Sequence, residues 1–353
     1  MAATKKKKTA LKVAAPKKKG ARALRGASPR KSSKLWVVPV GMLLVLATVG
    51  IFLVAHARYL ASLQFDMLRD APIVPQGHDQ GQATGLANLA GDPQGHVFVL
   101  ESQPGTPVRL QRFDAQDSPN TLVYKPAGKG EDLTAAVDVD CDPHGQVYVL
   151  LRDGRVQVLS NDLNYERSIF TGITGGSAIS VNSAGRIYVA DEQNNKVVFF
   201  NPTGARGGEF GGPASADVSL VTPILMRVAA DDEIVVVEGT PTGMRARIFN
   251  KDQTLRKTFL VDKLNEAPPV HMGINSQLKI FFNDASGSSG IDCWDLVTGK
   301  FFGASQATKD GVKFVNPGCI GANRYTPDVF VHTVPGLVKC QLPPPGEQSE
   351  EAQ

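Results

Sequence analysis

The chain beyond about residue 84 alternates between short apolar strands and polar turns, in a unit that recurs along the sequence. A turn containing Gly and then a strand of β-branched and aromatic residues appear in GHVFVLE (95–101), GQVYVLL (145–151) and GRIYVAD (185–191). Less regular copies follow as DEIVVVE (232–238), LKIFFND (278–284) and PDVFVHT (327–333). The first apolar residues of successive copies lie 50, 40, 47, 46 and 49 positions apart. This period is typical of a four-stranded propeller blade.

Further strands accompany each copy in phase. A strand of small and apolar residues precedes the turn, as at residues 136–140 and 178–182, and another strand follows, as at 155–159 and 196–200. No amphipathic helix of ordinary length interrupts the run. A single unit cannot bury both faces of its sheet alone. If the six units close into a ring, each sheet buries both faces against its neighbours. We therefore predict an all-β fold, a six-bladed β-propeller over residues 82–342.

The last unit predicts how the ring closes. It stops after its third strand, at about residue 342, because three prolines follow and Pro cannot donate to a β-ladder. A fourth strand must come from elsewhere, and residues 71–75, just before the first unit, are available. We predict that they close the ring, within a stalk and closing segment at 58–81, and that residues 343–353 form a disordered tail.

The third unit, residues 177–211, resembles an NHL repeat through its small-apolar strand, its turn with Gly and its Tyr-Val-Ala-Asp strand end. The second unit is similar in its first half, whereas the other four depart from the pattern. The resemblance extends over about residues 84–342 and implies a six-bladed NHL-like propeller. Most such propellers are binding platforms, and related six-bladed propellers include metal-dependent lactonases and lyases. The resemblance therefore indicates a fold and leaves the function open.

Carboxylates recur at the end of the second strand of each unit, which opens onto the usual binding face of a propeller. Aligning the repeats places Glu101, Asp191, Glu238 and Asp284 at this position, with Leu151 and Thr333 in the other two units. One interpretation is a ligand-binding acidic ring that attracts a cation or a basic ligand. The other is that each carboxylate accepts backbone N–H bonds in the following turn, as the Asp of the NHL pattern ordinarily does.

Polar residues also recur on the innermost strands, where alternate side chains face the channel. This alignment places Asn88, Asp138 and His271 near one mouth, and Asp140 and Arg227 deeper inside. Asp138, His271 and Arg227 are candidate catalytic residues, and Asp138, His271 and Asn88 are candidate ligands for calcium or zinc. The alternative is a water-filled channel in which Asp140 and Arg227 neutralise one another.

The N-terminal region has a different composition from the repeats. Residues 1–34 contain 13 Lys/Arg and no Asp or Glu, and 35–57 contain no charged residue of either kind. We predict a disordered cytoplasmic tail at 1–34 and a transmembrane helix at 35–57, with the propeller extracytoplasmic by the positive-inside rule. A signal peptide cleaved after Ala57 is the alternative. A bacterial inner membrane, with the propeller facing the periplasm, is the preferred setting.

The 38 Lys/Arg and 34 Asp/Glu of the 353 residues give a net charge of +4, but the part after residue 57 carries −9. This argues against nucleic acid as the partner of the main domain. Anionic lipid is a possible partner of the basic tail. The sequence has no Gly-x-Ser-x-Gly elbow, phosphate-binding glycine loop or Cys-x-x-Cys. Its four cysteines are compatible with disulfides or with free thiols; they are Cys141, Cys293, Cys319 and Cys340.

These observations favour a binding protein over an enzyme. We predict a membrane-tethered propeller that acts as a platform for a protein or small-molecule ligand, with no cofactor. The alternative is a metal-dependent, lactonase-like hydrolase or lyase, which would hold calcium or zinc at the channel mouth. A third possibility is a tether between the envelope and a cytoplasmic partner of the basic tail.

Overall fold

The structure is a computed structural model. It describes residues 40–62, 67–75, 86–102, 107–114, 121–128, 130–213, 218–240, 243–261, 269–284, 290–311, 314, 319–333 and 336–343. The predicted basic tail at 1–34, the start of the predicted span at 35–39 and the end of the chain from residue 344 lie outside these ranges.

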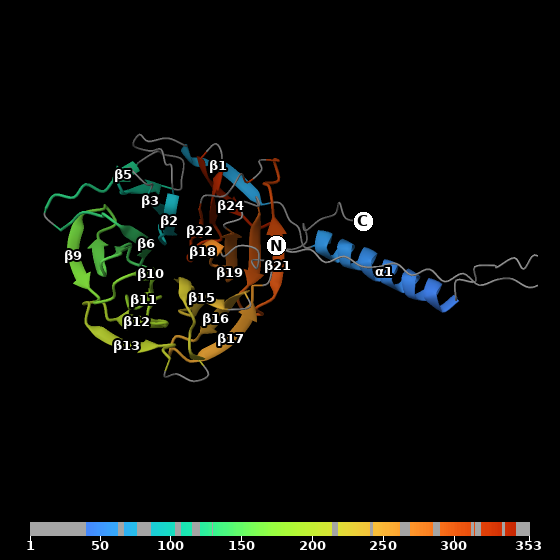
Figure 1. Cartoon of the computed structure of the whole chain (residues 1–353). Coiled ribbons are helices and arrows are strands. Elements are labelled where there is room, and N and C mark those ends of the chain that lie inside the picture. Colours follow the sequence, from blue (N-terminus) through green and yellow to red (C-terminus); the bar gives the residue numbers. More distant parts are fainter. Residues whose placement is uncertain are drawn as a thin grey trace, which may run out of the picture. The chain divides into compact units, whose positions relative to one another are not determined.

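The repeats form six sheets of four strands each, arranged as blades around a centre (Figure 1). Blade one contains β2 (Leu86–Gly91), β3 (His96–Glu101), β4 (Arg109–Asp114) and β5 (Thr121–Val123). Blade two contains β6 (Ala136–Cys141), β7 (Val147–Leu151), β8 (Arg155–Leu159) and β9 (Tyr165–Phe170). Blade three contains β10 (Gly176–Val181), β11 (Ile187–Asp191), β12 (Lys196–Phe200) and β13 (Arg206–Phe210).

Blade four contains β14 (Pro223–Val228), β15 (Ile234–Thr240), β16 (Gly243–Phe249) and β17 (Leu255–Leu260). Blade five contains β18 (Pro269–Ile274), β19 (Lys279–Asp284), β20 (Ile291–Asp295) and β21 (Phe301–Ser305). Blade six contains β22 (Ile320–Ala322), β23 (Val329–Thr333), β24 (Gly336–Gln341) and, from the N-terminal side, β1 (Leu68–Pro75). The six-bladed propeller predicted from the repeat period is confirmed.

Strand β1 closes the ring. It pairs antiparallel with β24, from Leu68 opposite Gln341 to Pro75 opposite Gly336, and lies at the outer edge of blade six (Figure 1). The closing strand predicted at residues 71–75 is therefore present and is longer than predicted. Met67, just before it, also forms a parallel bridge with Thr308, which follows the last strand of blade five. The N-terminal segment thus fastens to two blades.

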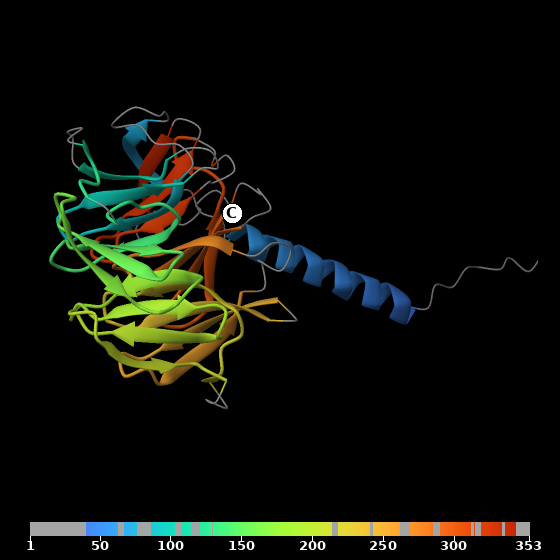
Figure 2. The ribbon, with the colours of Figure 1, turned by 60° about the vertical axis from the view of Figure 1, so that its left-hand side comes forward.

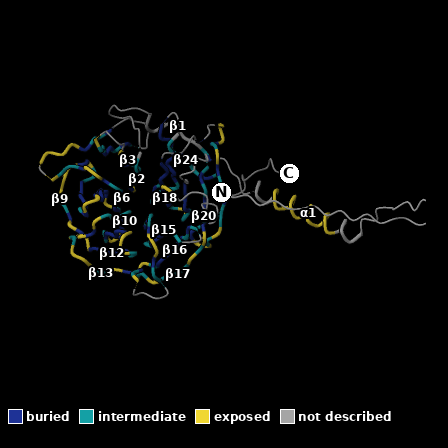
Figure 3. The backbone as a smooth tube through the Cα atoms, in the orientation of Figure 1, coloured by how far each residue is buried: buried dark blue, intermediate teal, exposed yellow. Residues whose placement is uncertain are grey.

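The second strand of each blade is the most deeply buried. All five residues of β7 and of β11 are buried, because both faces of these strands pack against neighbouring blades. The outer strands β9 and β13 are largely exposed (Figure 3). The turns before the second strands use Gly at positive φ, with 88° at Gly95 and 82° at Gly145, a conformation in which a Cβ atom is strained. Asp232 and Leu278 take the same positive φ in blades four and five, at 67° and 55°, so the turn requires this left-handed conformation, which Gly adopts without strain.

The core is divided among the blade interfaces rather than gathered in one centre. Six buried hydrophobic clusters of the described residues each span two neighbouring blades, and one of them joins blade six to blade one. Figure 2 shows the sheets of adjacent blades packed against one another. Each blade therefore needs both neighbours to bury its faces, which explains why an open end is costly.

Helix α1 (Val40–Ser62) precedes the propeller strands in the chain. Its described apolar side chains, among them Ile51 and Phe52, are 69% and 68% exposed. The helix extends past residue 57, where the predicted span ends. Within the described residues, no helix meets the combination of length and apolarity that crossing a bilayer requires.

Candidate functional site

The innermost strands place two layers of side chains along the channel, in the alignment that the sequence predicts. Asn88, Asp138 and His271 each lie opposite the penultimate residue of their second strands, namely Leu100, Leu150 and Asn283. Asp140 and Arg227 occupy the next layer, opposite Tyr148 and Val235. Residues from blades one, two, four and five therefore meet at the channel, as expected from the period of two along each strand.

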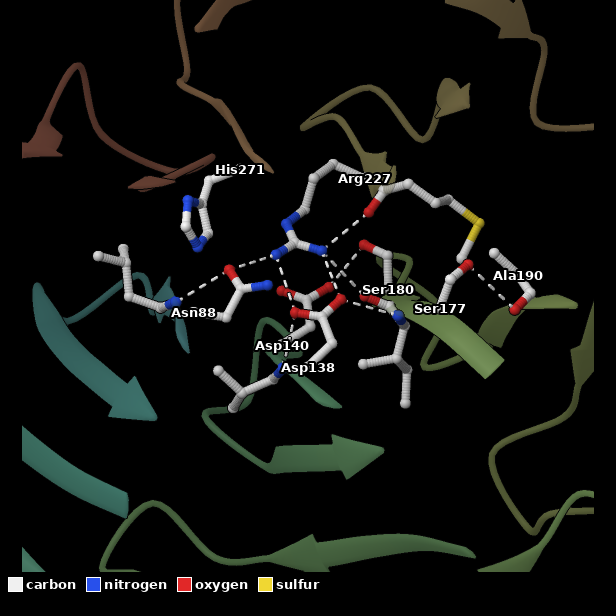
Figure 4. A network of polar contacts seen from close by, with 12 residues as sticks. Asn88, Asp138, Asp140, Ser177, Ser180, Ala190, Arg227 and His271 are labelled. Atoms are coloured by element: carbon white, nitrogen blue, oxygen red, sulfur yellow. Dashed lines mark hydrogen bonds and ion pairs between the residues drawn. The ribbon is translucent and has the colours of Figure 1, made fainter. Parts of the chain in front are cut away.

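Arg227 and Asp138 form a bidentate ion pair across the channel. Arg227 Nη1 donates to Asp138 Oδ2 at 2.7 Å and Nη2 to Oδ1 at 3.0 Å, while Nη2 also donates to Asn88 Oδ1 at 2.8 Å (Figure 4). The backbone N–H groups of Val139 and Ile179 donate to the two oxygens of Asp138 at 2.8 and 2.9 Å. One arginine of blade four thus connects blades one, two and three.

The electrostatics of this pair follow from its burial. Burial raises the pKa of Asp138, whereas Arg227 and the two backbone N–H groups act in the opposite direction and favour the carboxylate. Burial lowers the pKa of Arg227, but Asp138 and, to a smaller extent, Asp140 raise it by more, so that the pKa is raised. Bidentate geometry with added N–H donors is the arrangement in which a buried ion pair recovers its desolvation cost. We therefore treat the pair as ionised and without net charge.

Asp140 pairs with a different arginine from the one predicted. Arg324, in the turn between β22 and β23, donates to Asp140 Oδ2, which also accepts from Ser180 Oγ at 2.6 Å and the N–H of Val181 at 2.8 Å. The expected neutralisation of Asp140 by Arg227 is wrong, because the guanidinium of Arg227 forms its two ion-pair bonds with Asp138 instead. Sequence reasoning missed Arg324, although an Arg replaces the usual small or turn-forming residue there.

Arg324 fills the end of the channel that lies away from the mouth. Its Nη1 donates to the carbonyls of Val181 at 2.6 Å and Val228 at 3.0 Å, on blades three and four. Between the two arginines remains a cavity of about 10 Å³, lined in part by Asp140, Arg227 and Arg324. This is the room that one water molecule needs. Side chains of the described residues therefore fill the channel at this depth and leave room for about one water molecule.

His271 lies at the channel mouth as a neutral ring. Its Nε2 lies 2.9 Å from the carbonyl of Ala87, to which it donates, and its backbone N–H donates to Asn283 Oδ1 at 3.0 Å. Burial lowers the pKa of His271 to about 4. The Nδ1 atom is buried and has no hydrogen-bond partner. The ring can therefore accept one further hydrogen bond and stays uncharged at neutral pH.

The candidate metal ligands are already engaged. Each carboxylate oxygen of Asp138 accepts one backbone N–H and one guanidinium N–H, and Asn88 Oδ1 accepts from Leu89 N–H and Arg227. A carboxylate oxygen has about two lone-pair directions, so no direction is left for a cation. Across the described ranges, no group of three His, Cys, Asp or Glu side chains is placed to hold a metal ion. Asp138 and Asn88 thus do not fit the calcium or zinc site that the sequence suggested.

The predicted rim carboxylates are bound within their own blades. Glu101 accepts from Arg109 Nη2 at 2.7 Å and Gln111 Nε2 at 2.6 Å. Asp191 accepts from the side chain of Asn194 at 2.8 Å and from its backbone N–H at 3.2 Å. Asp191 thus accepts a backbone N–H of the following turn, whereas the partners given for Glu101 are side chains of the next strand. The side chain of Asp284 lies outside the described residues.

Glu238, the rim carboxylate of blade four, has two arginine partners. Arg245 Nε and Arg247 Nε each donate to Glu238 Oε1 at 2.6 Å, and the N–H of Val221 donates to Oε2 at 2.6 Å. Glu238 is fully buried. The position therefore carries a surplus of positive charge rather than the negative charge predicted for the rim.

The four cysteines are buried and form no disulfide. Burial raises the pKa of the Cys319 thiol to about 12 and raises those of Cys141 and Cys293 well above their usual range. Nucleophilic chemistry by these three thiols is thereby disfavoured.

Comparison with solved structures identifies the class of fold. The chain is similar to selenomethionine-substituted virginiamycin B lyase from Staphylococcus aureus, with 13% identity and a TM-score of 0.50 over 76% of this chain and 98% of that chain. It is also similar to a streptogramin B lyase, with 11% identity and a TM-score of 0.51 over 79% and 98%. A catalytically inactive virginiamycin B lyase from the same organism, solved with quinupristin, has 15% identity and a TM-score of 0.50 over 73% and 80%.

At these identities the likeness establishes the fold alone, and the chain is a six-bladed β-propeller. No family model matches the sequence. No curated protein matches it either.

Proposed function

We propose that this protein is a membrane-tethered, extracytoplasmic propeller of the NHL type that binds a protein or small-molecule ligand on its rim. The observation that carries the proposal is the closed channel. Two ion pairs, Arg227 with Asp138 and Arg324 with Asp140, fill the channel. Within each pair, the arginine neutralises the charge of the carboxylate. Among the described residues, the side chains leave between Arg227 and Arg324 a cavity of only about 10 Å³, so we place recognition at the strand ends and loops around the mouth.

The proposed membrane tether rests on the sequence. The basic residues of 1–34 and the uncharged stretch 35–57 fit a span whose N-terminus is cytoplasmic, in a bacterial inner membrane with the propeller in the periplasm. The exposed apolar side chains of α1 support this proposal. The full chain is expected to stay in the membrane fraction through alkaline carbonate extraction. A released chain that begins at Arg58 would instead establish a cleaved signal peptide.

Site-specific photo-crosslinking tests the binding platform. A photoreactive residue at Val270, which is 44% exposed and adjoins His271 at the mouth, is compared with one at Val297, which is 56% exposed in the turn between β20 and β21 at the opposite end of blade five. The proposal predicts a discrete crosslinked product from position 270 and none from position 297. Equal products from both positions, or none from either, would contradict it.

A second candidate is a propeller hydrolase or lyase, and His271 is the observation that favours it. The ring is neutral, and its Nδ1 has no hydrogen-bond partner, so it can accept a hydrogen bond from a substrate. The three solved structures described above are lyases, which supports the candidate at the level of fold only. Ester- or lactone-cleaving activity that is lost in His271→Gln, with an unchanged melting temperature, would establish it.

A further inference from the structure

Among the described residues at the rim of blade four, two arginines share one carboxylate. Arg245 and Arg247 lie two positions apart on β16 and therefore project from the same face of the sheet. Both direct their Nε atoms at one oxygen of Glu238, within 2.6 Å. One buried carboxylate thus balances one of the two guanidinium groups, and among the described residues no second carboxylate contacts the other.

Blade one shows what a balanced version of this arrangement looks like. There Glu101 takes the place of Glu238, Arg109 that of Arg245, and Gln111 that of Arg247. Gln111 donates to Glu101 Oε1 at 2.6 Å, the same length as the bond from Arg247 to Glu238. A neutral amide is therefore sufficient to satisfy the carboxylate. The second arginine of blade four adds charge that the fold does not need.

Arg247 also has an unsatisfied donor. The residue is 6% exposed, and its Nη1 atom is buried without a hydrogen-bond partner. Leaving an N–H of a buried cation unpaired is costly, and such groups are rare in folded proteins. Arg245 is more accessible, with 25% of its side chain exposed. The N–H donors of Arg245 are therefore partly exposed, and those of Arg247 are buried beside them.

Apolar side chains flank the two arginines. Leu260 lies directly opposite Arg245 across the β16–β17 ladder and is 54% exposed. Val221, whose N–H donates to Glu238, is 41% exposed. A ligand that reaches the arginines therefore also meets exposed aliphatic groups.

We propose that the rim of blade four binds a carboxylate that is carried next to an aliphatic group, as at the C-terminus of a peptide ending in a branched residue. The planar carboxylate matches the fork of donors on Arg245 and Arg247. It supplies the missing counter-charge and a partner for Arg247 Nη1, and its aliphatic neighbour covers Leu260 and Val221. The proposal names the ligand chemistry of the rim and so rests on the proposed binding platform.

Matched small molecules test the proposal on the purified full chain. N-acetyl-leucine carries the carboxylate and the aliphatic group, whereas N-acetyl-leucinamide differs only in having a neutral amide. Saturation-transfer NMR and a titration are expected to show binding of the acid at least about tenfold tighter than that of the amide, because one charge-assisted contact is lost. Equal binding of the two compounds would overturn the proposal.

The variant Arg247→Gln recreates the arrangement of blade one and keeps a donor to Glu238, so the fold is expected to persist. It should weaken N-acetyl-leucine binding at least about tenfold. The control Arg155→Gln removes the same charge from the third strand of blade two, where Leu151 occupies the rim position, and should leave binding unchanged. Equal affinity in wild type and Arg247→Gln would overturn the proposal.

The crosslinking experiment at Val270 distinguishes the binding platform from the carboxylate site at the rim of blade four. Crosslinks at position 270 without any binding of N-acetyl-leucine would refute the carboxylate site alone and leave the platform standing. Selective N-acetyl-leucine binding that Arg247→Gln abolishes would support the site, even if a protein ligand of the platform were never captured.

Discussion

Arg324 and Asp140 form an ion pair across the channel although they lie 184 positions apart in the chain. The pair connects the last blade to the second, and the same guanidinium donates to carbonyls of blades three and four. The ring is therefore closed in two ways. Strand β1 completes the sheet of blade six at its outer edge, and Arg324 connects blade six to blades two, three and four at the channel. Both contacts involve blade six, which is the last blade in the chain and the one that must join blade one.

Removing Arg324 is expected to destabilise the propeller strongly. Arg324→Met leaves the buried carboxylate of Asp140 without its charged partner, which costs about 3–5 kcal/mol for pairs of this kind. Denaturant unfolding measures the change. The double variant Arg324→Met with Asp140→Asn should recover much of the loss, since it removes both charges. Arg152→Met, at an exposed position, is the control and should change the free energy of unfolding by less than about 0.5 kcal/mol.

The closing strand should be essential for a monomeric fold. A chain that begins at residue 76 lacks β1 and exposes the edge of β24, which is a template for pairing with another chain. Size-exclusion chromatography with light scattering is expected to show oligomers, whereas a chain that begins at residue 63 should retain the closed ring. A stable monomer from the shorter chain would show that blade six needs no fourth strand.

Met67 should contribute to stability through its place between blades five and six. Its side chain is fully buried, its N–H donates to the carbonyl of Ala307 and its own carbonyl accepts from Lys309. Met67→Ala should lower the free energy of unfolding by about 2–5 kcal/mol, as for other large-to-small changes in a core. A loss below about 1 kcal/mol would mean that the contact with blade five is not maintained in solution.

The neutral ring of His271 makes stability depend on pH. Its pKa is about 4 in the folded protein and 6.5 in the unfolded chain, so between these values the unfolded state binds more protons. Stability from this group is complete above about pH 6.5 and is lost as the pH falls towards 4, by up to about 3 kcal/mol. Unfolding free energies at pH 7 and pH 4.5 measure it. His271→Gln should show a smaller fall over that interval; an identical fall would assign the dependence to other groups.

The sequence predicts the architecture well because its signals are local. Period-two strands, Gly at turns such as Gly145, and the prolines after residue 342 each follow from backbone geometry, and together they predict the blades and the closing strand. The same periodicity places Asn88, Asp138 and His271 in one layer. These residues were correctly aligned because a shift of one position would turn each of them away from the channel.

The partners within the channel could not be predicted in the same way. Arg227 is in register with Asp140, yet its long side chain reaches Asp138 in the neighbouring layer, where backbone N–H groups already orient the carboxylate. Arg324 comes from a turn outside the strand repeat, so strand periodicity gives no indication of it. Aligning the repeats places Glu238 in an acidic ring because it considers the carboxylate alone. The charge at this rim position also depends on Arg245 and Arg247 on the next strand.

The most direct test of the account replaces the ion pair at the channel mouth and follows ligand binding at the rim. The double variant Asp138→Asn with Arg227→Met removes both charges and keeps similar side-chain volumes. If recognition occurs at the rim, the photoreactive residue at position 270 will form the same crosslinked product in this variant as in the otherwise unchanged protein. Loss of that product, with the propeller still folded by circular dichroism and thermal melting, would show that the ligand requires the channel residues and would contradict the account.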